Sequence, residues 1–537
     1  MDVVAVVTER YTYKELNSLV PTVSKPPPPV PPRARLVLEG LQEEVPVADP
    51  VSVYVRVRPL LQEEQDEHLL QGLLGEDNKD LEQGVALKTD QVTIGGFSGV
   101  LGPTCDNEAV FQSSFLPRLD TVVQGGLASL FCYGYTGSGK SHTVLGSRGQ
   151  EGLYRKAAGH LLEQLEQRHP GRQLFLVASA CEIYGEQVYD LLGKEKLQCS
   201  LRTDGEGNLC VAGPAVRTDL RDVVKECAKL GEGDHATLVT LSRGLRHWPV
   251  RSLEDLERFS STALQQRVVG SSTEHTASSR SHALLRMEVV DQQLLEAKEA
   301  VEEAKALLPA LLNALDNHTS ECHKKLVVFD GGKDGKVGLR QYPGGQEEWD
   351  RAREELQEKK EALQKMVPPV MSRIDVAYRR LEAAQEQEKG TGGVLLLVDL
   401  AGADYDKRDL TVTTPQQRKE STDINKSLLA LKECFRTIGG VYGSTAARSC
   451  FRGSKLTRLL EDSLLPPDSS SRRNKQCSGV MIVNVSPTER LAKRTLNVLR
   501  YGQIFSDGSK QDVRKTTMAG AQKMTKPWAA KTVDGQK

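Results

Sequence analysis

The chain has 537 residues, of which 38% are hydrophobic and 27% are charged, and its formal net charge is −1. This balance excludes a positive electrostatic field over the whole protein, so we expect no nucleic acid partner. Binding to any other polyanion would require a local basic patch. No run of ~18 apolar residues is present, so no membrane span is predicted, and the ten cysteines lack metal-ligand spacing, as in a reduced cytoplasmic protein.

Residues 1–49 are predicted to be a disordered leader. Positions 25–33 read KPPPPVPPR, and consecutive prolines favour polyproline II because they lack the N–H that helices and inner strands need. We interpret this segment as a stiff, solvated leader, with docking into an aromatic-lined groove as the alternative.

From residue 50 to 505, apolar runs typical of strands alternate with helical patterns. The predicted strands are 51–58, 128–133, 174–180 with a continuation to 192, 281–290, 394–399 and 480–485, and the predicted helices are 108–124, 152–168, 254–268, 421–438, 454–464 and 488–501. Near-continuous apolar strands that alternate with helices predict an α/β domain, with a central mostly parallel or mixed sheet and helices on both faces.

The segment 291–390 interrupts this alternation. Its apolar residues recur at spacings of three and four, although Pro309 falls inside the first stripe and Pro368 and Pro369 end the second. The turn signal at 331–335 lies between the two stripes. We predict an inserted helical arm with a β-hairpin tip, whose stripes suit a protein partner; a partly disordered loop is the alternative.

The segment after the last predicted helix shows no heptads. Residues 502–508 do not continue the helical pattern, and 506–537 are rich in Lys, Gln, Gly and Thr. We therefore predict a disordered tail without a dimerising coiled coil, and a monomer.

The stretch 134–141 has the spacing G-x-x-x-x-G-K-S between a predicted strand and a predicted helix. It comprises Gly134, Tyr135, Thr136, Gly137, Ser138, Gly139, Lys140 and Ser141. Small residues let the backbone wrap around phosphate oxygens, Lys140 would reach the β- and γ-phosphates, and the Ser141 hydroxyl would hold Mg²⁺. The spacing thus predicts a phosphate-binding loop; an ordinary Gly/Ser turn is the alternative.

Two further stretches make this prediction more specific. Residues 278–282 read SSRSH before a strand, and residues 399–402 read DLAG at the end of a strand. An acid at a strand end can hold the water shell of Mg²⁺, and a following glycine lets a backbone N–H approach the γ-phosphate. The three loops together predict a sensor of the γ-phosphate.

With these motifs the chain resembles a kinesin motor domain. The stretches that carry the resemblance occur in the family's order and are 55–59, 134–142, 182–192, 278–282, 399–402, 424–431, 454–464 and 499–501. The resemblance implies a P-loop NTPase fold, ATP and Mg²⁺ as ligands, and microtubules as the partner.

The resemblance also implies roles for the site residues. Adenine is framed by Arg56, Arg58, Pro59 and His142. Phosphate is bound by residues 134–141 and Ser278, and Mg²⁺ by Ser141, Ser279 and Asp399. In the catalytic set, Ser279, Arg280, Gly402 and Asp404, the glycine senses the γ-phosphate and Arg280 pairs with Asp404.

A local basic face is expected for the acidic track. By the resemblance it comprises Lys407, Arg408, Arg418, Lys419, Lys426, Lys432, Arg436, Arg448, Arg452, Lys455 and Arg458. Ordinary solvated charge is the alternative, and for Lys455 and Arg458 internal packing.

Two site positions depart from the family's pattern. His275 stands where Asn is usual, and an imidazole cannot present amide geometry to the nucleotide. Asp404 stands where Glu is usual and is one methylene shorter, so its bridge to Arg280 needs a backbone shift or a longer distance. The loop 466–475 is also longer than the family's usual turn.

The leading hypothesis is an ATP-dependent, microtubule-binding motor ATPase of the cytoplasmic cytoskeleton, whose nucleotide state changes track affinity through two switch loops. The alternative is a nucleotide- or microtubule-binding module with little or no turnover, which His275 and Asp404 favour. An unrelated P-loop enzyme would leave the stretches 424–431 and 454–464 without a role.

Overall fold

The computed structural model spans residues 1–537. The structure describes residues 51–74, 84–89, 92–147, 149–193, 197–203, 209–212, 215–219, 238–242, 244–268, 280–326, 329–331, 337–339, 345–387, 391–402, 415–438, 449–464 and 476–521. The chain forms two compact units, a larger one of 48–217, 240–306 and 377–537 and a smaller one of 1–47, 218–239 and 307–376. The predicted leader, 1–49, lies outside the described residues.

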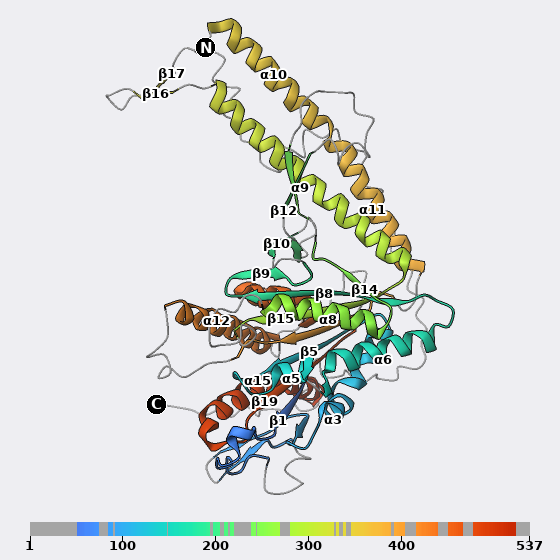
Figure 1. Ribbon diagram of the computed structural model, residues 1–537, viewed down its shortest axis with the longest axis vertical. Helices are drawn as coiled ribbons and strands as arrows, with labels where there is room; N and C mark the ends of the chain where they lie inside the picture. The colour runs from blue at the N-terminus through green and yellow to red at the C-terminus, as the bar shows by residue number, and fades with distance from the viewer. Residues whose placement is uncertain are drawn as a thin grey trace, which may run out of the picture. The chain divides into compact units, whose positions relative to one another are not determined.

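The larger unit is built on an 11-stranded sheet (Figure 1). Its strand order is β11 (Leu209–Ala212), β10 (Leu197–Thr203), β9 (Gln187–Asp190), β8 (Phe175–Tyr184), β15 (His282–Val290), β18 (Val394–Asp399), β5 (Leu127–Tyr133), β19 (Cys477–Val485), β1 (Val51–Val57) and β4 (Gly99–Leu101), and β14 (Trp248–Val250) pairs with β8. The pairs from β18 to β4 are parallel, whereas β15 is antiparallel to both β18 and β8. The predicted mixed α/β sheet is therefore confirmed.

The register brings three chain segments to one edge of this sheet. Asp399 at the end of β18 is paired with Cys132 near the end of β5. Because β15 runs in the opposite direction, its beginning lies at the same edge, with Ala283 paired to Asp399. The loop after β5, the loop after β18 and the residues before β15 therefore meet there.

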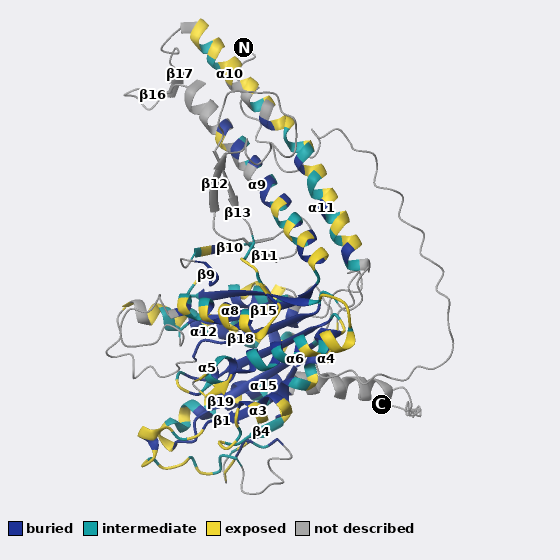
Figure 2. Ribbon diagram, turned by 45° about the vertical axis from the view of Figure 1, so that its right-hand side comes forward, coloured by how far each residue is buried: buried dark blue, intermediate teal, exposed yellow. Residues whose placement is uncertain are grey.

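Helices cover both faces of the sheet, whose strands are largely buried (Figure 2). The side chains of the strands alternate between two cores. In β5, Ala128, Leu130 and Cys132 face one core, whereas Phe131 and Tyr133 face the other. The first core is closed by α6 (Leu153–Arg168) and α8 (Leu253–Val268), and α5 (Lys140–Leu145) adds Val144 to it. The second core is closed by α12 (Pro415–Ile438), α14 (Lys455–Leu464) and α15 (Ala492–Ala521).

The predicted helix 108–124 is divided into shorter pieces. It consists of α3 (Asn107–Val110), a π-helical turn at Phe111–Phe115, a 3₁₀ turn at Leu116–Arg118 and α4 (Leu119–Val123). Pro117 lies in the 3₁₀ turn. Because proline lacks an N–H, it fits the start of a new turn rather than the interior of a regular helix.

The prediction that the last helix ends near residue 501 is wrong, since α15 continues to Ala521. Gly502 does not end the helix. A Cβ at this position would lie 2.6 Å from Val483 Cγ2, so glycine permits the helix to approach β19 closely. Phe505 then packs on Phe435, with ring centroids 4.0 Å apart. Residues 506–521 of the predicted tail are thus helical, and the rest of it lies outside the described residues.

The segment 291–390 contains the helices and hairpin that the sequence predicts. They are α9 (Gln292–Leu326), the antiparallel strands β16 (Phe329–Gly331) and β17 (Val337–Leu339), α10 (Gly345–Lys365) and α11 (Val367–Gln387). Although Pro309 falls inside the first stripe, α9 continues through it. Pro368 and Pro369 fall in the first turn of α11, where the backbone N–H groups have no helical partner.

Candidate functional site

The loop between β5 and α5 depends on its glycines. Gly137 and Gly139 have φ angles of +83° and +98°, which residues with a Cβ rarely adopt. At Gly134 a Cβ would lie 2.4 Å from the Asn484 carbonyl oxygen, so this position needs a residue without a side chain. The sequence therefore specifies a tight loop that begins where β5 ends and returns into α5.

Lys140, the first residue of α5, is buried beneath this loop. Its ammonium group donates a hydrogen bond to the Tyr135 carbonyl oxygen over 2.9 Å. The Lys140 side chain is thus folded toward the loop 134–141, and its positive charge lies next to that loop. This arrangement suits a multiply charged anion.

Ser141 and Asp399 come together at the sheet edge, as the motifs predict. The Ser141 hydroxyl donates to Asp399 Oδ2 over 2.8 Å. Asp399 is 2% exposed, and its second oxygen, Oδ1, has no hydrogen-bond partner among the described residues. The backbone N–H of Leu400 donates to the Cys132 carbonyl oxygen over 3.2 Å, which fixes the loop after β18 against β5.

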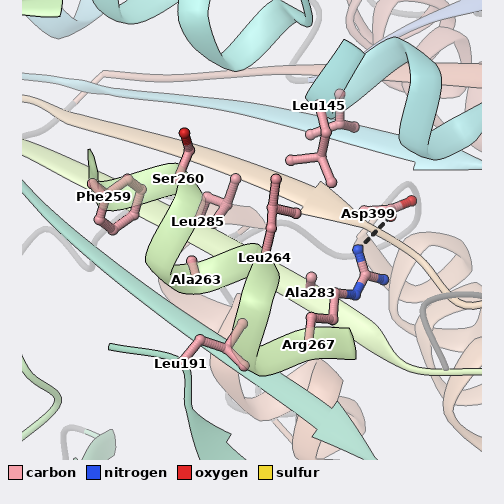
Figure 3. A pocket seen from close by; sticks show the side chains of 11 residues that line it. Leu145, Leu191, Phe259, Ser260, Ala263, Leu264, Arg267, Ala283, Leu285 and Asp399 are labelled. Carbon is pink, nitrogen blue, oxygen red and sulfur yellow. Dashed lines mark hydrogen bonds and ion pairs between the residues drawn. The ribbon is translucent and has the colours of Figure 1, made fainter. Parts of the chain in front are cut away.

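Arg267, at the end of α8, is a site residue that the sequence analysis missed. Its Nη1 lies 2.8 Å from Asp399 Oδ2, so the carboxylate is shared between a guanidinium and a hydroxyl. Figure 3 shows this ion pair at one end of a pocket whose other lining side chains are mostly apolar, from α5, α8 and the sheet. An arginine in the last turn of an amphipathic helix is common, so no sequence signal marks this one.

The donor set fits a magnesium ion. Mg²⁺ prefers oxygen ligands and keeps several waters, and a serine hydroxyl beside a carboxylate with an unpartnered buried oxygen supplies such ligands. Arg267 competes for the same carboxylate, because a guanidinium and a divalent cation cannot both occupy one oxygen without mutual repulsion.

The predicted adenine-framing residues are held in internal contacts. The Arg56 guanidinium is buried and donates to Asn107 Oδ1 over 2.6 Å and to Thr143 Oγ1 over 2.9 Å. Burial lowers the pKa of this arginine. His142 is half-buried, and burial together with the nearby Arg56 charge lowers its pKa, so the ring is neutral at pH 7. Pro59 is exposed.

Arg58 holds the predicted phosphate-binding loop in place through a hydrogen bond to its backbone. Its Nε donates to the Gly137 carbonyl oxygen over 3.0 Å, and its two terminal nitrogens form a bidentate pair with Glu64 at 2.6 Å each. The hydrogen bonds from Arg58 lower the pKa of Glu64. Glu64 was not predicted, because its partner is recognisable only from the fold.

The first switch is described only from Arg280 onward. Arg280 Nη1 lies 2.9 Å from Glu420 Oε2 on α12, and the hydroxyl of Tyr184 donates to the other Glu420 oxygen. Ser278, Ser279, His275 and Asp404 lie outside the described residues. The predicted Arg280–Asp404 pair stays a prediction, whereas Glu420 is the described partner. Gly402 follows the segment 399–401 in the sequence and is buried.

The predicted basic face contains exposed and half-buried cations. Arg418, Lys419, Lys426, Arg436 and Arg452 are exposed, Lys432, Lys455 and Arg458 are half-buried, and Lys407, Arg408 and Arg448 lie outside the described residues. Lys426 lies 3.2 Å from Glu186 in the β8–β9 turn, and the Lys455 ammonium donates to the Glu186 carbonyl oxygen. Lys455 thus has an internal contact, as its alternative interpretation requires.

Comparison with known proteins identifies the family. The family model of the kinesin motor domain matches residues 56–325 and 370–507, more than half of the chain. The chain belongs to the kinesin motor-domain family. Kinesin motor domains generally bind nucleotide and hydrolyse ATP, in agreement with the loop, hydroxyl and carboxylate described above.

The sequence identity to individual kinesins is low. Mouse "Kinesin-like protein KIF24" is 26% identical over 431 residues, which are 80% of this chain and 21% of the relative. Arabidopsis thaliana "Kinesin-like protein KIN-13B" is 27% identical over 504 residues, which are 91% of this chain and 53% of the relative. The chain therefore spans about a fifth and about half of these two relatives.

A solved kinesin confirms the fold. The structure described as "Structure of a fast kinesin: Implications for ATPase mechanism and interactions with microtubules" has a TM-score of 0.51 and is 18% identical, and the match covers 86% of this chain and 92% of that one. In this kinesin motor domain, no helix among the described residues is long and apolar enough to cross a membrane.

Proposed function

We propose that this kinesin motor domain is an ATP-dependent, microtubule-binding motor ATPase of the cytoplasmic cytoskeleton, and that two switch loops couple its nucleotide state to its affinity for the track. The supporting observation is the convergence of Ser141, Asp399 and Arg280 at one sheet edge, together with the ion pair that joins Arg280 to α12. The ion pair between Arg280 and Glu420 thus connects the proposed nucleotide site directly to α12, the helix that carries several exposed lysines and arginines.

The chain's own residues have distinct tasks in this proposal. Lys140 exchanges its contact with the Tyr135 carbonyl for a phosphate oxygen, and the loop N–H groups hold the remaining phosphate oxygens. Ser141 and Asp399 would hold Mg²⁺, which neutralises charge between the β- and γ-phosphates. Because Arg267 forms an ion pair with the same carboxylate, its guanidinium must move away from Asp399 when the metal binds.

The remaining predicted residues act on the γ-phosphate. Ser278 and Ser279 supply hydroxyls, the Gly402 N–H senses the phosphate, and Arg280 orders the water molecules used in hydrolysis. When both switches close, Arg280 would break its ion pair with Glu420 and form one with Asp404. The proposal therefore requires that one guanidinium has two alternative partners. Such an exchange of ion pairs is a common form of switch between two states.

Steady-state ATPase activity with and without microtubules tests the proposal. We expect turnover that microtubules stimulate and that Lys140→Ala abolishes, whereas Lys493→Ala, at an exposed lysine of α15, leaves it unchanged. Nucleotide binding without turnover would instead support the binding-module alternative. Restoring the family's usual residues with His275→Asn and Asp404→Glu would then show whether these two positions suppress hydrolysis.

Cosedimentation with microtubules tests the track-binding part. The exposed cations of α12 should make binding sensitive to salt, because charges more than a Debye length apart are screened at ~0.15 M ionic strength. A loss of affinity on Arg418→Ala and Lys419→Ala, with normal nucleotide binding, is expected. Unchanged affinity would remove α12 from the interface.

A further inference from the structure

His282, the first residue of β15, lies between the loop after β18 and the helix α12. It is 3% exposed. Its Nδ1 is 3.0 Å from the backbone nitrogen of Ala401, and its Nε2 is 2.8 Å from the Ser427 hydroxyl. A single imidazole therefore contacts both elements that the proposed function requires to move together.

The direction of each hydrogen bond follows from the partners. The Ala401 N–H can only donate, so Nδ1 must accept, and the single hydrogen of the neutral ring is on Nε2. Nε2–H therefore donates to the Ser427 oxygen, and the Ser427 hydroxyl donates to the Ile424 carbonyl oxygen over 2.7 Å. Burial lowers the pKa of His282 to about 3, which keeps the ring in this neutral form.

The chain of hydrogen bonds joins two elements that are connected in sequence only through 403–414, which lie outside the described residues. At one end, Ala401 lies between Asp399 and the predicted phosphate sensor Gly402. At the other end, Ser427 is two helical turns beyond Glu420, the partner of Arg280. The segment 280–282 thus holds α12 at two points, by an ion pair and by the imidazole.

We propose that His282 is a positioning residue that transmits displacement of the loop 399–402 to α12, and so couples nucleotide occupancy to the track-binding helix. The inference rests on the proposed function. Every buried imidazole needs partners for both of its ring nitrogens. What distinguishes His282 is that its two partners belong to different elements, the loop after β18 and the helix α12.

The two hydrogen bonds of the His282 ring can be removed separately by substitution. In His282→Asn the amide oxygen replaces Nδ1 and can accept from Ala401, but the side chain is too short to reach Ser427. In His282→Gln the amide nitrogen replaces Nε2 and can donate to Ser427, but the acceptor for Ala401 is lost. Ser427→Ala removes the link from the α12 side, and Ser427→Thr keeps the hydroxyl.

Ser463 provides a matched control. It is also a buried helical serine, in α14, and its hydroxyl donates to the carbonyl three residues earlier, at Leu460, over 2.8 Å. Ser463→Ala therefore removes the same kind of local hydrogen bond as Ser427→Ala without touching His282. Any effect on stability alone should be similar in the two variants.

Hydrogen–deuterium exchange of peptides from 415–438 measures the coupling without requiring turnover. We expect ADP and a non-hydrolysable ATP analogue to give different protection of these peptides in the wild type, in Ser427→Thr and in Ser463→Ala. In His282→Asn, His282→Gln and Ser427→Ala this difference should be lost, with nucleotide affinity retained. The ratio of microtubule-stimulated to basal ATPase should fall about fivefold, the factor that corresponds to one neutral hydrogen bond.

The possible outcomes separate this inference from the proposed function. Nucleotide-dependent protection of 415–438 that persists in all three cut variants overturns the role of His282 but leaves the ATPase proposal intact. A wild type that binds nucleotide without any change in 415–438 overturns the coupling itself. A wild type that binds no nucleotide refutes the proposed function and the coupling together.

Discussion

The buried ion pair of Arg58 and Glu64, next to the loop 134–141, gives a quantitative prediction for stability. Glu64→Gln removes the charge that faces Arg58 and leaves the side-chain volume almost unchanged. The two side chains are 3% and 10% exposed and form two hydrogen bonds of 2.6 Å, so the variant leaves a buried guanidinium without a counter-ion. Breaking such a pair from one side costs about 3 kcal/mol or more.

The exposed pair Glu254–Arg258 is the matched control. Its atoms are 2.5 Å apart, but its side chains are 73% and 59% exposed. Glu254→Gln should therefore leave the free energy of unfolding almost unchanged, because solvent screens an exposed ion pair. Urea unfolding followed by circular dichroism gives both free energies, and we expect the midpoint to fall clearly only for Glu64→Gln.

The same pair predicts a pH dependence. The hydrogen bonds from Arg58 depress the pKa of Glu64 in the folded state, so the unfolded chain binds this proton more readily than the folded one. The contribution is complete above the unfolded pKa of ~4.3 and is lost as the pH falls through the lower folded value. In Glu64→Gln the acid-dependent loss should be smaller. Equal midpoints for wild type and Glu64→Gln at pH 7 would refute the reasoning.

Three further predictions concern packing, catalysis and the track. Gly502→Ala should destabilise the fold by about 2 kcal/mol in urea unfolding, because its Cβ would lie 2.6 Å from a Val483 methyl group. Gly159→Ala, in the interior of α6, should instead stabilise the fold by about 0.5 kcal/mol, because its Cβ would lie at an ordinary contact distance, 3.4 Å, from Leu253 Cδ2 of α8. The reverse order would contradict the packing argument. Asp399→Asn should reduce the rate constant of ATP hydrolysis in single-turnover assays by about a hundredfold or more, and normal hydrolysis would remove this residue from the metal site. Glu186→Gln should free Lys426 and tighten microtubule cosedimentation at low salt, and weaker binding would contradict this.

The local features of the fold were predictable because each depends on the spacing of residues that are close together in the sequence. The predicted strand 128–133 is present as β5 (Leu127–Tyr133), with the glycine-rich loop directly after it, and the stripes of 291–390 predicted its helices. The end of the last helix was not predictable in the same way, since Gly502 suggests a helix end by propensity but serves here to bring α15 close to Val483.

The site was predictable only where its residues belong to motifs. Ser141 and Asp399 meet as expected, yet Arg267 and Glu420 complete the arrangement from 132 and 140 residues away in sequence from their partners. Neither lies in a spacing that indicates chemistry. Their roles depend on strand order, in particular on β15 running antiparallel to β18, which the pattern of apolar residues does not specify.

That antiparallel pairing has a consequence for the insertion. The backbone of Val289 exchanges hydrogen bonds with Gly392 and Gly393, at 2.7 and 2.8 Å, so the chain leaves the sheet and re-enters it at adjacent positions. In topological terms the whole of 291–390 is a hairpin connection between neighbouring strands, at the end of β15 and β18 remote from Asp399. Residues such as Leu294, Ala297 and Ala384 belong to a small core with Phe175, but 307–376 forms a separate compact unit. The length of the segment 291–390 can therefore vary without disturbing the register that places Ser141 and Asp399 next to each other.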